Sequence, residues 1–461
     1  MTDASLSAGL SSSAKRKSLM IMAAWAFVFF MATGPFYFQL KGLDPAGSQE
    51  QVGKPYGDYL RYFMTVIIAV YTVQRGALNA VFRTLTTAPF LMAFVALAVA
   101  SSVWSEDPYL TLRSSGSVVC MVFGFAAALT LLSPTDSVRA LLYGAMLCIF
   151  FSILWAVFLP HYGQHDVNDI FQASHVGKWR GVYAHKNHLG QVAGITVGAL
   201  ASAGGRLLPR NIRYLAIVAG VVCLGFAQSA SGMLIAGIGF GFGYALFQLK
   251  GYPRVVALAI GIFVCVLLSD AGSDLLSAIL VAMGKSPTFS GRTFLWDAAM
   301  QLIPERWLLG FGLSTVHDPS ITSVFEKASG GEVQDAHNGY LELIIALGVL
   351  GLFLFLAAVV DAAVKGWNAR LVGPAATARQ SMTIVAVMVL FAALAEVSAM
   401  MPGDTSSAFL IFPIMWLSAS PVVSGRERVR ERALQDKDGS QLTVKKRGAD
   451  KRKRGSIVSL D

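Results

Sequence analysis

The sequence predicts an all-α protein, a polytopic bundle of transmembrane helices, and three observations support this. Of the 461 residues, 55% are hydrophobic and only 14% are charged, with a mean hydropathy of +0.58. A soluble protein of this length needs more charge to cover its surface. Several uncharged runs of about 18 residues or more could cross a hydrocarbon core of about 30 Å. These runs are continuous and do not alternate with period two, which excludes an outer-membrane β-barrel.

The first apolar run predicts a membrane anchor. Residues 1–18 are polar and contain the basic triplet Lys15–Lys17, and an apolar run follows from Leu19 to Leu40. A cleaved signal peptide has an apolar core of about 7–15 residues and a small-residue cleavage site. This run is longer and has no such site after it. We therefore expect a signal anchor with its N-terminus in the cytoplasm.

The remaining apolar runs bring the expected number of spans to about twelve. They are Leu60–Val73, Ala88–Val103, Gly116–Leu132, Val138–Leu159, His188–Ala203, Ile212–Gln228, Gly232–Leu249, Arg254–Ser269, Gly339–Val360, Met382–Met400 and Ser407–Ser420. The chain then divides into a cytoplasmic segment (1–18), nine spans (19–269), a large loop (270–338), three spans (339–420) and a basic tail (421–461).

The charges of the connecting segments give the expected orientation. Counted from a cytoplasmic N-terminus, every inner loop carries Lys or Arg, as the positive-inside rule requires. Both termini are then cytoplasmic, and the long segments 160–187 and 270–338 lie on the other side. The tail is basic and poor in aromatic residues, which is typical of a disordered segment held inside by its charge. Binding of the tail to anionic lipid is compatible with this, and no nucleic-acid partner is expected because no folded binding module accompanies the charge.

Most other polar or reactive residues have simple interpretations. The four cysteines lie in apolar runs and are expected in the core. His161, His165, His175 and His317 lie in polar loops and are expected to be solvated, and they show no zinc spacing, so no metal site is predicted. Glu396, in an apolar run, is a second-rank functional candidate. Glycines 237–243 are typical of close helix packing.

Residues 178–190, reading KWRGVYAHKNHLG, form the first candidate cluster. Arg180 and Lys186 lie immediately before an expected span, on the side that the positive-inside rule leaves poor in cations. Cations at a helix N-terminus suit a phosphate group, because the backbone donors and the helix dipole add to their charge. The same residues could instead anchor the protein among lipid headgroups, and residue types alone leave both interpretations open.

The long loop holds the second candidate cluster. Arg292 precedes a short amphipathic segment that contains Trp296, and His337 lies just before the span that begins at Gly339. The helix dipole should favour a neutral imidazole, the form that a general base needs. Asn338 and Glu342 are four residues apart and should share a helix face. A surface cation at Arg292 and a simple helix cap around His337 are the alternative interpretations.

These motifs resemble those of the bacterial O-antigen ligase/polymerase (Wzy/WaaL-like) family. Arg180-Gly181 with residues 185–190 is similar to the RG…HKNxLG signature of exopolysaccharide polymerases of the ExoQ type. The segments at Gly291-Arg292, at 309–312 (LGFG) and at 337–342 (HNGYLE) resemble the ligase/polymerase domain. The resemblance extends from about residue 104 to 413 and leaves out the basic tail.

The resemblance implies a GT-C-like membrane glycosyltransferase of the bacterial inner membrane that uses no metal or other cofactor. The substrate implied is an oligosaccharide linked to undecaprenyl diphosphate, handled at the periplasmic face. Carried onto this chain, Arg180, Lys186 and Arg292 would bind the donor diphosphate, His337 would be the catalytic base, and Asn338 and Glu342 would orient it. A chain-length regulator and a flippase are the implied partners, besides membrane lipids. The alternatives are a ligase that transfers glycan to lipid A core and, from another class, a transporter of polysaccharide or lipid-linked sugar.

Overall fold

The computed structural model describes residues 3–46, 54–167, 175–247, 249, 293–313, 319–329, 335–394 and 405–420. Within these ranges the secondary structure is helical, with one isolated β-bridge between Gln164 and Trp179. This confirms the predicted all-α class. The predicted span at 254–269 and the basic tail lie outside the described residues.

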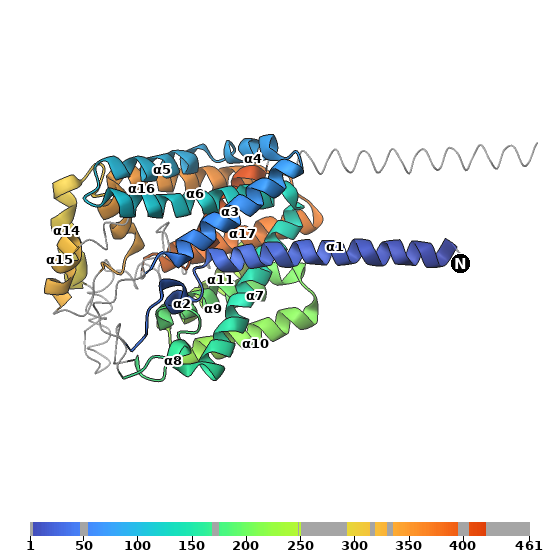
Figure 1. Cartoon of the computed structure of the whole chain (residues 1–461), viewed down its shortest axis with the longest axis horizontal. Coiled ribbons are helices and arrows are strands. Elements are labelled where there is room, and N and C mark those ends of the chain that lie inside the picture. Colours follow the sequence, from blue (N-terminus) through green and yellow to red (C-terminus); the bar gives the residue numbers. More distant parts are fainter. Residues whose placement is uncertain are drawn as a thin grey trace, which may run out of the picture.

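Most of the helices pack around one extended core, and α14 and α15 pack around a second, smaller one (Figure 1). In chain order they are α1 (Asp3–Ala32), α2 (Tyr37–Lys41), α3 (Tyr56–Gln74), α4 (Leu78–Leu85), α5 (Pro89–Ala100), α6 (Pro108–Leu131), α7 (Pro134–Phe158), α8 (Pro160–Gly163), α9 (Lys186–Ala201), α10 (Arg210–Ala227), α11 (Ala230–Phe247), α14 (Thr293–Leu302), α15 (Pro319–Ser329), α16 (Gly339–Asn368) and α17 (Gly373–Ala392), followed by an apolar helix over Ala408–Ser420.

The described helices confirm an integral membrane bundle. Five of them, α6, α7, α10, α16 and α17, are long and apolar enough to span a membrane. A sixth span results if α3 and α4, which meet at a bend of 117°, are counted together. Shorter apolar helices cover Ser18–Ala32, Pro89–Val103, Ala230–Ala245 and Ala408–Ser420.

Two predicted spans differ from the observed helices for local reasons. The run from 19 to 40 does not form one helix, because Gly34 adopts a φ of 64° and Pro35 follows it. Proline disfavours helical backbone at the residue before it, so α1 ends at Ala32 and α2 is separate. The run predicted at 382–400 begins inside α17, which extends from Gly373 to Ala392, and its residues 395–400 lie outside the described residues.

Glycines let α9 approach α11 closely. A β-carbon on Gly194 would overlap the carbonyl oxygen of Gly232. Of the glycines predicted to pack helices, Gly239 lies against Gly198, whereas Gly237 has no atom within 4 Å of the position that a β-carbon would take. Small-residue packing is therefore confirmed, but on one face of α11 only.

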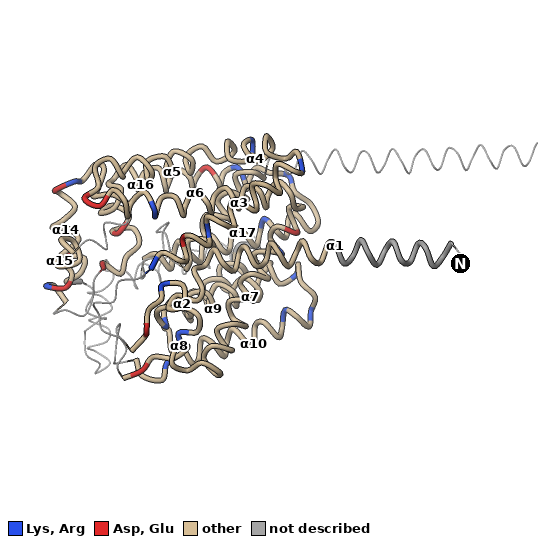
Figure 2. The backbone as a smooth tube through the Cα atoms, viewed as in Figure 1, with Lys and Arg blue, Asp and Glu red and all other residues tan. Residues whose placement is uncertain are grey.

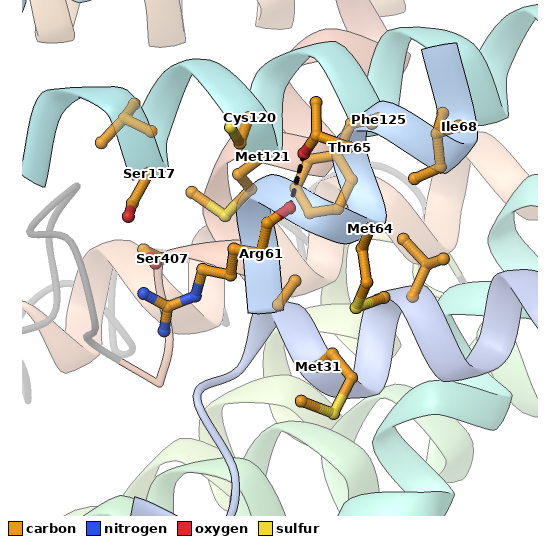
Figure 3. Close-up of a pocket in the computed structure, with 14 residues that line it drawn as sticks. Met31, Arg61, Met64, Thr65, Ile68, Ser117, Cys120, Met121, Phe125 and Ser407 are labelled. Atoms are coloured by element: carbon orange, nitrogen blue, oxygen red, sulfur yellow. Dashed lines mark hydrogen bonds between the residues drawn. The ribbon is translucent and has the colours of Figure 1, made fainter. Parts of the chain in front are cut away.

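The two ends of the bundle differ in charge. Figure 2 shows Lys and Arg at both ends, whereas Asp and Glu lie mostly at the end of α14 and α15, so the opposite end is basic. The residues at this basic end are those of the predicted inner loops, including Arg83, Arg139 and Arg210. The opposite end, where α9 and α16 begin, is called the site end below. At the site end, a groove opens between α1, α3 and α6 (Figure 3).

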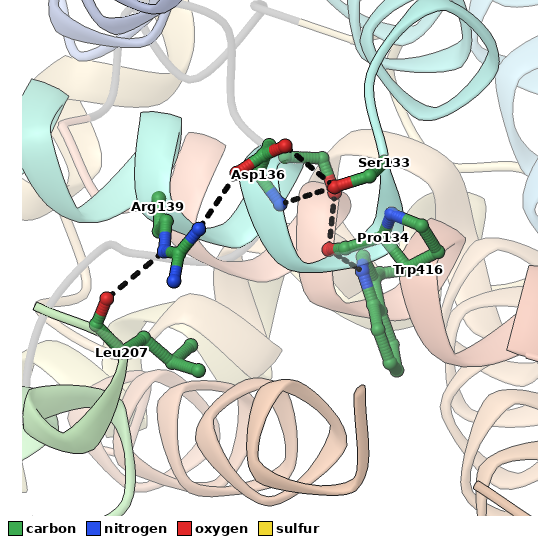
Figure 4. Close-up of polar contacts among 7 residues, drawn as sticks. Ser133, Pro134, Asp136, Arg139, Leu207 and Trp416 are labelled. Atoms are coloured by element: carbon green, nitrogen blue, oxygen red, sulfur yellow. Dashed lines mark hydrogen bonds and ion pairs between the residues drawn. The ribbon is translucent and has the colours of Figure 1, made fainter. Parts of the chain in front are cut away.

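Polar contacts at the basic end hold three parts of the chain together (Figure 4). Ser133 caps α7 by accepting a hydrogen bond from the Asp136 backbone N–H at 3.1 Å, and Pro134 occupies the first helical position. Arg139 binds Asp136 at 2.9 Å and donates to the Leu207 carbonyl. Trp416 Nε1 donates to the Pro134 carbonyl at 3.1 Å, which attaches the last described helix to α7.

Candidate active site

A short loop in front of α16 carries the predicted base. Asp335 Oδ1 accepts a hydrogen bond from the His337 backbone N–H at 2.7 Å and lies 3.1 Å from His337 Nδ1. The His337 side chain is 27% exposed and that of Asp335 33%, so the imidazole is accessible. A carboxylate at Nδ1 selects the tautomer whose Nε2 carries the lone pair, which is the arrangement that a general base needs.

The backbone of His337 is constrained. Its φ is 47°, in the left-handed region that few non-glycine residues adopt. Such conformations cost about 1–3 kcal/mol and persist where the surroundings hold them. The hydrogen bonds of Ala336, His337 and Asn338 keep the backbone in this conformation.

Asn338 is the N-cap of α16. Its Oδ1 accepts from the backbone N–H of Tyr340 at 3.0 Å and of Leu341 at 3.3 Å. The backbone N–H of Gly339 donates to the Ala393 carbonyl at the end of α17. These bonds satisfy donors that a helix start leaves open, and they fix where α16 begins relative to α17.

Glu342 of α16 stabilises the loop that carries His337. The side chain is fully buried, and Oε1 accepts from the Ala336 backbone N–H at 2.6 Å. Its Oε2 is buried with no hydrogen-bond partner among the described residues. Trp296 Nε1, from α14, donates to the Ala336 carbonyl at 2.9 Å. The peptide next to His337 is therefore held from both sides, by α16 and by α14.

A break in α16 docks the LGFG segment beside this loop. Gly348 has φ 67° and ψ −174° inside α16, and a β-carbon there would overlap the Leu308 carbonyl. The carbonyls of Ile345 and Ala346 accept from the N–H groups of Phe311 and Gly312, each at 2.8 Å. The backbone of 307–312 thus replaces the helix's own partners across the break. The LGFG motif at 309–312 therefore joins this segment to α16.

Arg292 lies outside the described residues. The helix that follows it, α14, begins at Thr293 and carries Trp296 to the loop of His337. Trp296 is therefore the described residue that links the Arg292 motif to the His337 motif.

Arg180, in the other cluster, is completely buried. Its Nε donates to the Tyr162 carbonyl at 2.9 Å, and its Nη2 donates to the His161 carbonyl at 3.1 Å. The guanidinium also lies 4.6 Å from the centre of the Phe38 ring. These contacts tie the 178–185 loop to the end of α8 and to α2.

Lys186 begins α9 and is nearly buried. Its Nζ donates to Asn187 Oδ1 and to the Gln228 carbonyl, each at 3.3 Å. Its backbone N–H donates to His165 Nε2 at 3.1 Å. The start of α9 is thereby joined to the end of α10 and to the preceding loop.

Four histidines cluster around this helix start. The rings of His165, His175 and His185 lie 5.2–5.7 Å apart, and His188 is 6.4 Å from His185. The prediction that His165 is solvated is wrong, because its side chain is only 2% exposed. The prediction for His161 is consistent with a side chain 44% exposed, and His317 lies outside the described residues. His165 was misassigned because a polar stretch does not reveal that the loop folds inward.

His185 caps α9 in a neutral form. Its Nδ1 accepts from the Asn187 backbone N–H at 3.2 Å, and Nε2 is buried with no hydrogen-bond partner among the described residues. Burial lowers the pKa of His185 far below its usual value, and the neighbouring histidines and Lys186 lower it further. Over the part of the chain that is described, no group of three or more His, Cys, Asp or Glu side chains is arranged to hold a metal ion.

The structure thus groups the predicted residues into two clusters at the site end. His337, Asn338 and Glu342 share one, and Arg180 and Lys186 share the other. Sequence reasoning missed Asp335, although an acidic residue two positions before a candidate histidine was a usable signal. The roles of His185 and His165 had no comparable signal.

Comparisons with known proteins found a matching family model and a matching relative. Residues 215–356 match a family model described as O-antigen ligase (Wzy_C). The chain is also 26% identical over 290 residues to the exopolysaccharide production protein ExoQ of Rhizobium meliloti (strain 1021). The predicted resemblance to the O-antigen ligase and ExoQ-type family is confirmed. The ExoQ match covers 59% of this chain and 64% of the relative, just under two thirds of its length.

The O-antigen ligase match contains one of the two clusters. Residues 215–356 include Arg292, Trp296, the loop of His337 and the break of α16 at Gly348. Arg180 and Lys186 precede this range in the sequence. The His337 cluster therefore lies within the region that matches the family, and the Arg180 cluster lies N-terminal to it.

Proposed function

We propose that the chain is an exopolysaccharide polymerase that transfers a growing glycan from undecaprenyl diphosphate onto a lipid-linked repeat unit. A membrane polysaccharide polymerase or ligase is the broader activity that the family supports. The observation that carries the proposal is the accessible Asp335–His337 pair on a loop held by α14 and α16. It provides a general base in an otherwise apolar bundle.

In the proposed reaction, His337 Nε2 removes the proton from the attacking sugar hydroxyl. The new glycosidic bond forms as the bond to the lipid diphosphate breaks, with inversion at the anomeric carbon. Asp335 holds the imidazole and stabilises its protonated form. Asn338 and Glu342 position the loop through the helix cap and the Ala336 peptide.

The leaving diphosphate gains negative charge, so fixed cations stabilise the transition state. We assign this role to Arg292 and Lys186, which need no metal ion to fulfil it. Arg180 is fully buried and donates to carbonyl oxygens. Its proposed contribution is to hold the loop of Lys186 and to add its positive field to the diphosphate site.

The proposed setting is the bacterial inner membrane, with both termini cytoplasmic and the site end facing the periplasm. The other end of the bundle shows Lys and Arg with few acidic residues, and this basic end supports the orientation (Figure 2). A chain-length regulator and a flippase of the same pathway are the proposed partners.

A ligase that moves glycan to lipid A core is the second candidate, favoured by the description of the matching domain. The test is polymerisation in detergent by purified protein given an undecaprenyl-diphosphate repeat unit, with EDTA present. We expect a ladder of longer lipid-linked glycans, lost in His337→Ala and in Arg292→Ala. The control is His161→Ala, which removes an exposed histidine that also pairs with an aspartate.

The outcomes separate the candidates. Transfer only when lipid A core is supplied would make the chain a ligase. Activity that survives in both folded variants would refute the site. Transport of a lipid-linked sugar into proteoliposomes without bond formation would favour the transporter.

A further inference from the structure

The groove at the site end has an apolar wall formed by three helices. Met31 of α1, Met64 and Ile68 of α3, and Met121 and Phe125 of α6 line it (Figure 3). The space measures about 580 Å³, including the part that is open to the outside. Methionine side chains adapt their shape easily, so this wall suits a long, flexible apolar chain.

One end of the groove is cationic. Arg61 Nη1 lies 3.1 Å from Asp58 Oδ1, and Arg113 Nε lies 3.1 Å from Asp58 Oδ2. Ser117 also donates to Asp58 at 3.1 Å. One carboxylate therefore faces two guanidinium groups. The Arg113 Nε–H is buried and does not have hydrogen-bond geometry towards any described partner.

A third cation belongs to the same group. Lys41 of α2 follows Leu40, which lies 3.7 Å from the position of a β-carbon on Gly57, next to Asp58. Desolvation lowers the pKa of Lys41, Asp58 raises it, and the two arginines lower it further. Counting the described residues alone, this group has three basic side chains and one carboxylate, an excess of positive charge. A bound phosphate would balance it.

The groove is positioned for entry from the membrane. The helices that line it carry exposed apolar side chains on their outer surfaces: Phe27 of α1, Phe63 of α3 and Val119 of α6. Such surfaces contact lipid in a membrane protein. An amphiphile could therefore enter sideways, with its tail among the methionines and its headgroup at Arg61 and Arg113.

The groove is connected to the candidate active site through contacts of the segments between them. The segment before α6 contacts residues 306–313. Arg306 donates to the Trp104 carbonyl at 3.0 Å, and the Leu313 N–H donates to Ser101 Oγ. Residues 311 and 312 of that region in turn bond to α16. A short set of contacts thus joins the cationic end of the groove to the helix that carries His337.

We propose that this groove binds the acceptor's lipid carrier, with its polyprenyl chain along the methionine wall and its diphosphate at Lys41, Arg61 and Arg113. The inference rests on the proposed function, in which two lipid-linked glycans react. Two lipid-diphosphate sites are then required at one face. Arg292 and Lys186 are assigned to the donor, and the groove supplies the second site.

The test is photolabelling of the full-length protein in nanodiscs of neutral lipid. The probe is a polyprenyl diphosphate with a diazirine on its chain, and labelled peptides are mapped. Labels are expected on α1, α3 and α6. Arg61→Gln or Arg113→Gln should reduce labelling roughly ten-fold, the effect of losing one hydrogen bond to a charged group.

A second variant tests the apolar wall without changing charge. A β-carbon on Gly124 meets only Ile68 Cδ1 at 3.8 Å, so Gly124→Leu should fold and fill the groove. Gly225→Leu is the matched control, since Gly225 in α10 is exposed and has no atom within 4 Å of that position. Labelling should fall in Gly124→Leu and stay unchanged in Gly225→Leu, with both variants melting as cooperatively as the wild type.

Two outcomes would overturn the proposal: equal labelling of Gly124→Leu and wild type, or displacement of the probe by phosphatidylglycerol as readily as by unlabelled polyprenyl diphosphate. The second would indicate a site for bulk anionic lipid. His337→Ala separates this inference from the proposed function, because it should abolish polymerisation and keep the labelling. Specific labelling of a wild-type protein that forms no glycosidic bond would refute the polymerase and leave the lipid-diphosphate site standing.

Discussion

Replacing Asp335 by Asn tests whether the carboxylate acts through His337. The substitution keeps the shape and an oxygen for the His337 N–H, but removes the charge 3.1 Å from Nδ1. A hydrogen bond to a charged group contributes about 1.5–3 kcal/mol, which corresponds to roughly 10- to 150-fold in rate. Both side chains are partly exposed, at 27% and 33%, and solvent screens the pair. We therefore expect a loss near the lower limit, about ten-fold.

The assay is the initial rate of glycan transfer from lipid-linked repeat units, measured for a double-mutant cycle. General-base catalysis contributes about 10²- to 10⁴-fold, so His337→Ala should lose more than Asp335→Asn. Because the charge of Asp335 acts through the imidazole and Asn keeps an acceptor for the His337 N–H, the double variant should be no slower than His337→Ala alone. Asp44→Asn is the control, since Asp44 also pairs with a histidine, His161, at 2.8 Å. Additive losses in the double variant would refute the reasoning.

Three further predictions concern stability. Asn338→Ala removes the cap of α16 and should destabilise the protein by about 1 kcal/mol, seen as a lower melting temperature in detergent. Gly348→Ala places a β-carbon against the Leu308 carbonyl at a φ of 67°. The free energy of unfolding should fall by about 1–3 kcal/mol or more, seen as a lower melting temperature. The lowered pKa of His185 makes the unfolded chain bind more protons below about pH 6.5, so stability is full above that pH and falls on acidification. The slope from this group is at most about 1.4 kcal/mol per pH unit.

Each of these predictions has a matched control. Asn338→Ser keeps a capping oxygen and should restore the melting temperature. Gly225→Ala lies where a β-carbon meets nothing within 4 Å and should change little. His185→Asn keeps an acceptor for the Asn187 N–H and should flatten the acid-side loss of stability. An unchanged slope in His185→Asn would refute the assignment of that loss to His185.

Local signals predicted the start of α16 to the residue. Asn338 is a strong capping residue followed by an apolar run, and the structure shows it capping a helix that begins at Gly339. The spacing of Asn338 and Glu342 was informative in a different way from the one expected. The i, i+4 rule says which residues share a helix face but not whether that face is buried, and Glu342 lies entirely inside.

Features that depend on distant partners were not predictable. The break of α16 at Gly348 requires the backbone of 307–312, about forty residues earlier, and the uninterrupted apolar run gives no sign of it. Arg180 likewise finds its acceptors at residues 161 and 162 and its aromatic partner at Phe38. The position of a cation before a helix therefore does not reveal that its side chain is buried and bonded to backbone carbonyls. The number of spans was also not predictable, because a bend such as the one between α3 and α4 divides an apolar run into two helices.

The break in α16 has a consequence for how the protein is assembled. In lipid, each backbone polar group without a partner costs several kcal/mol, so α16 cannot rest in the membrane with Ile345 and Ala346 unpaired. Their partners, Phe311 and Gly312, are synthesised first and lie on the segment that leads into the helix. A straight α16 would pair these carbonyls within the helix, so the break at Gly348 can form only together with docking of that segment. The shape of α16 and the attachment of residues 307–312 are therefore settled in one folding step.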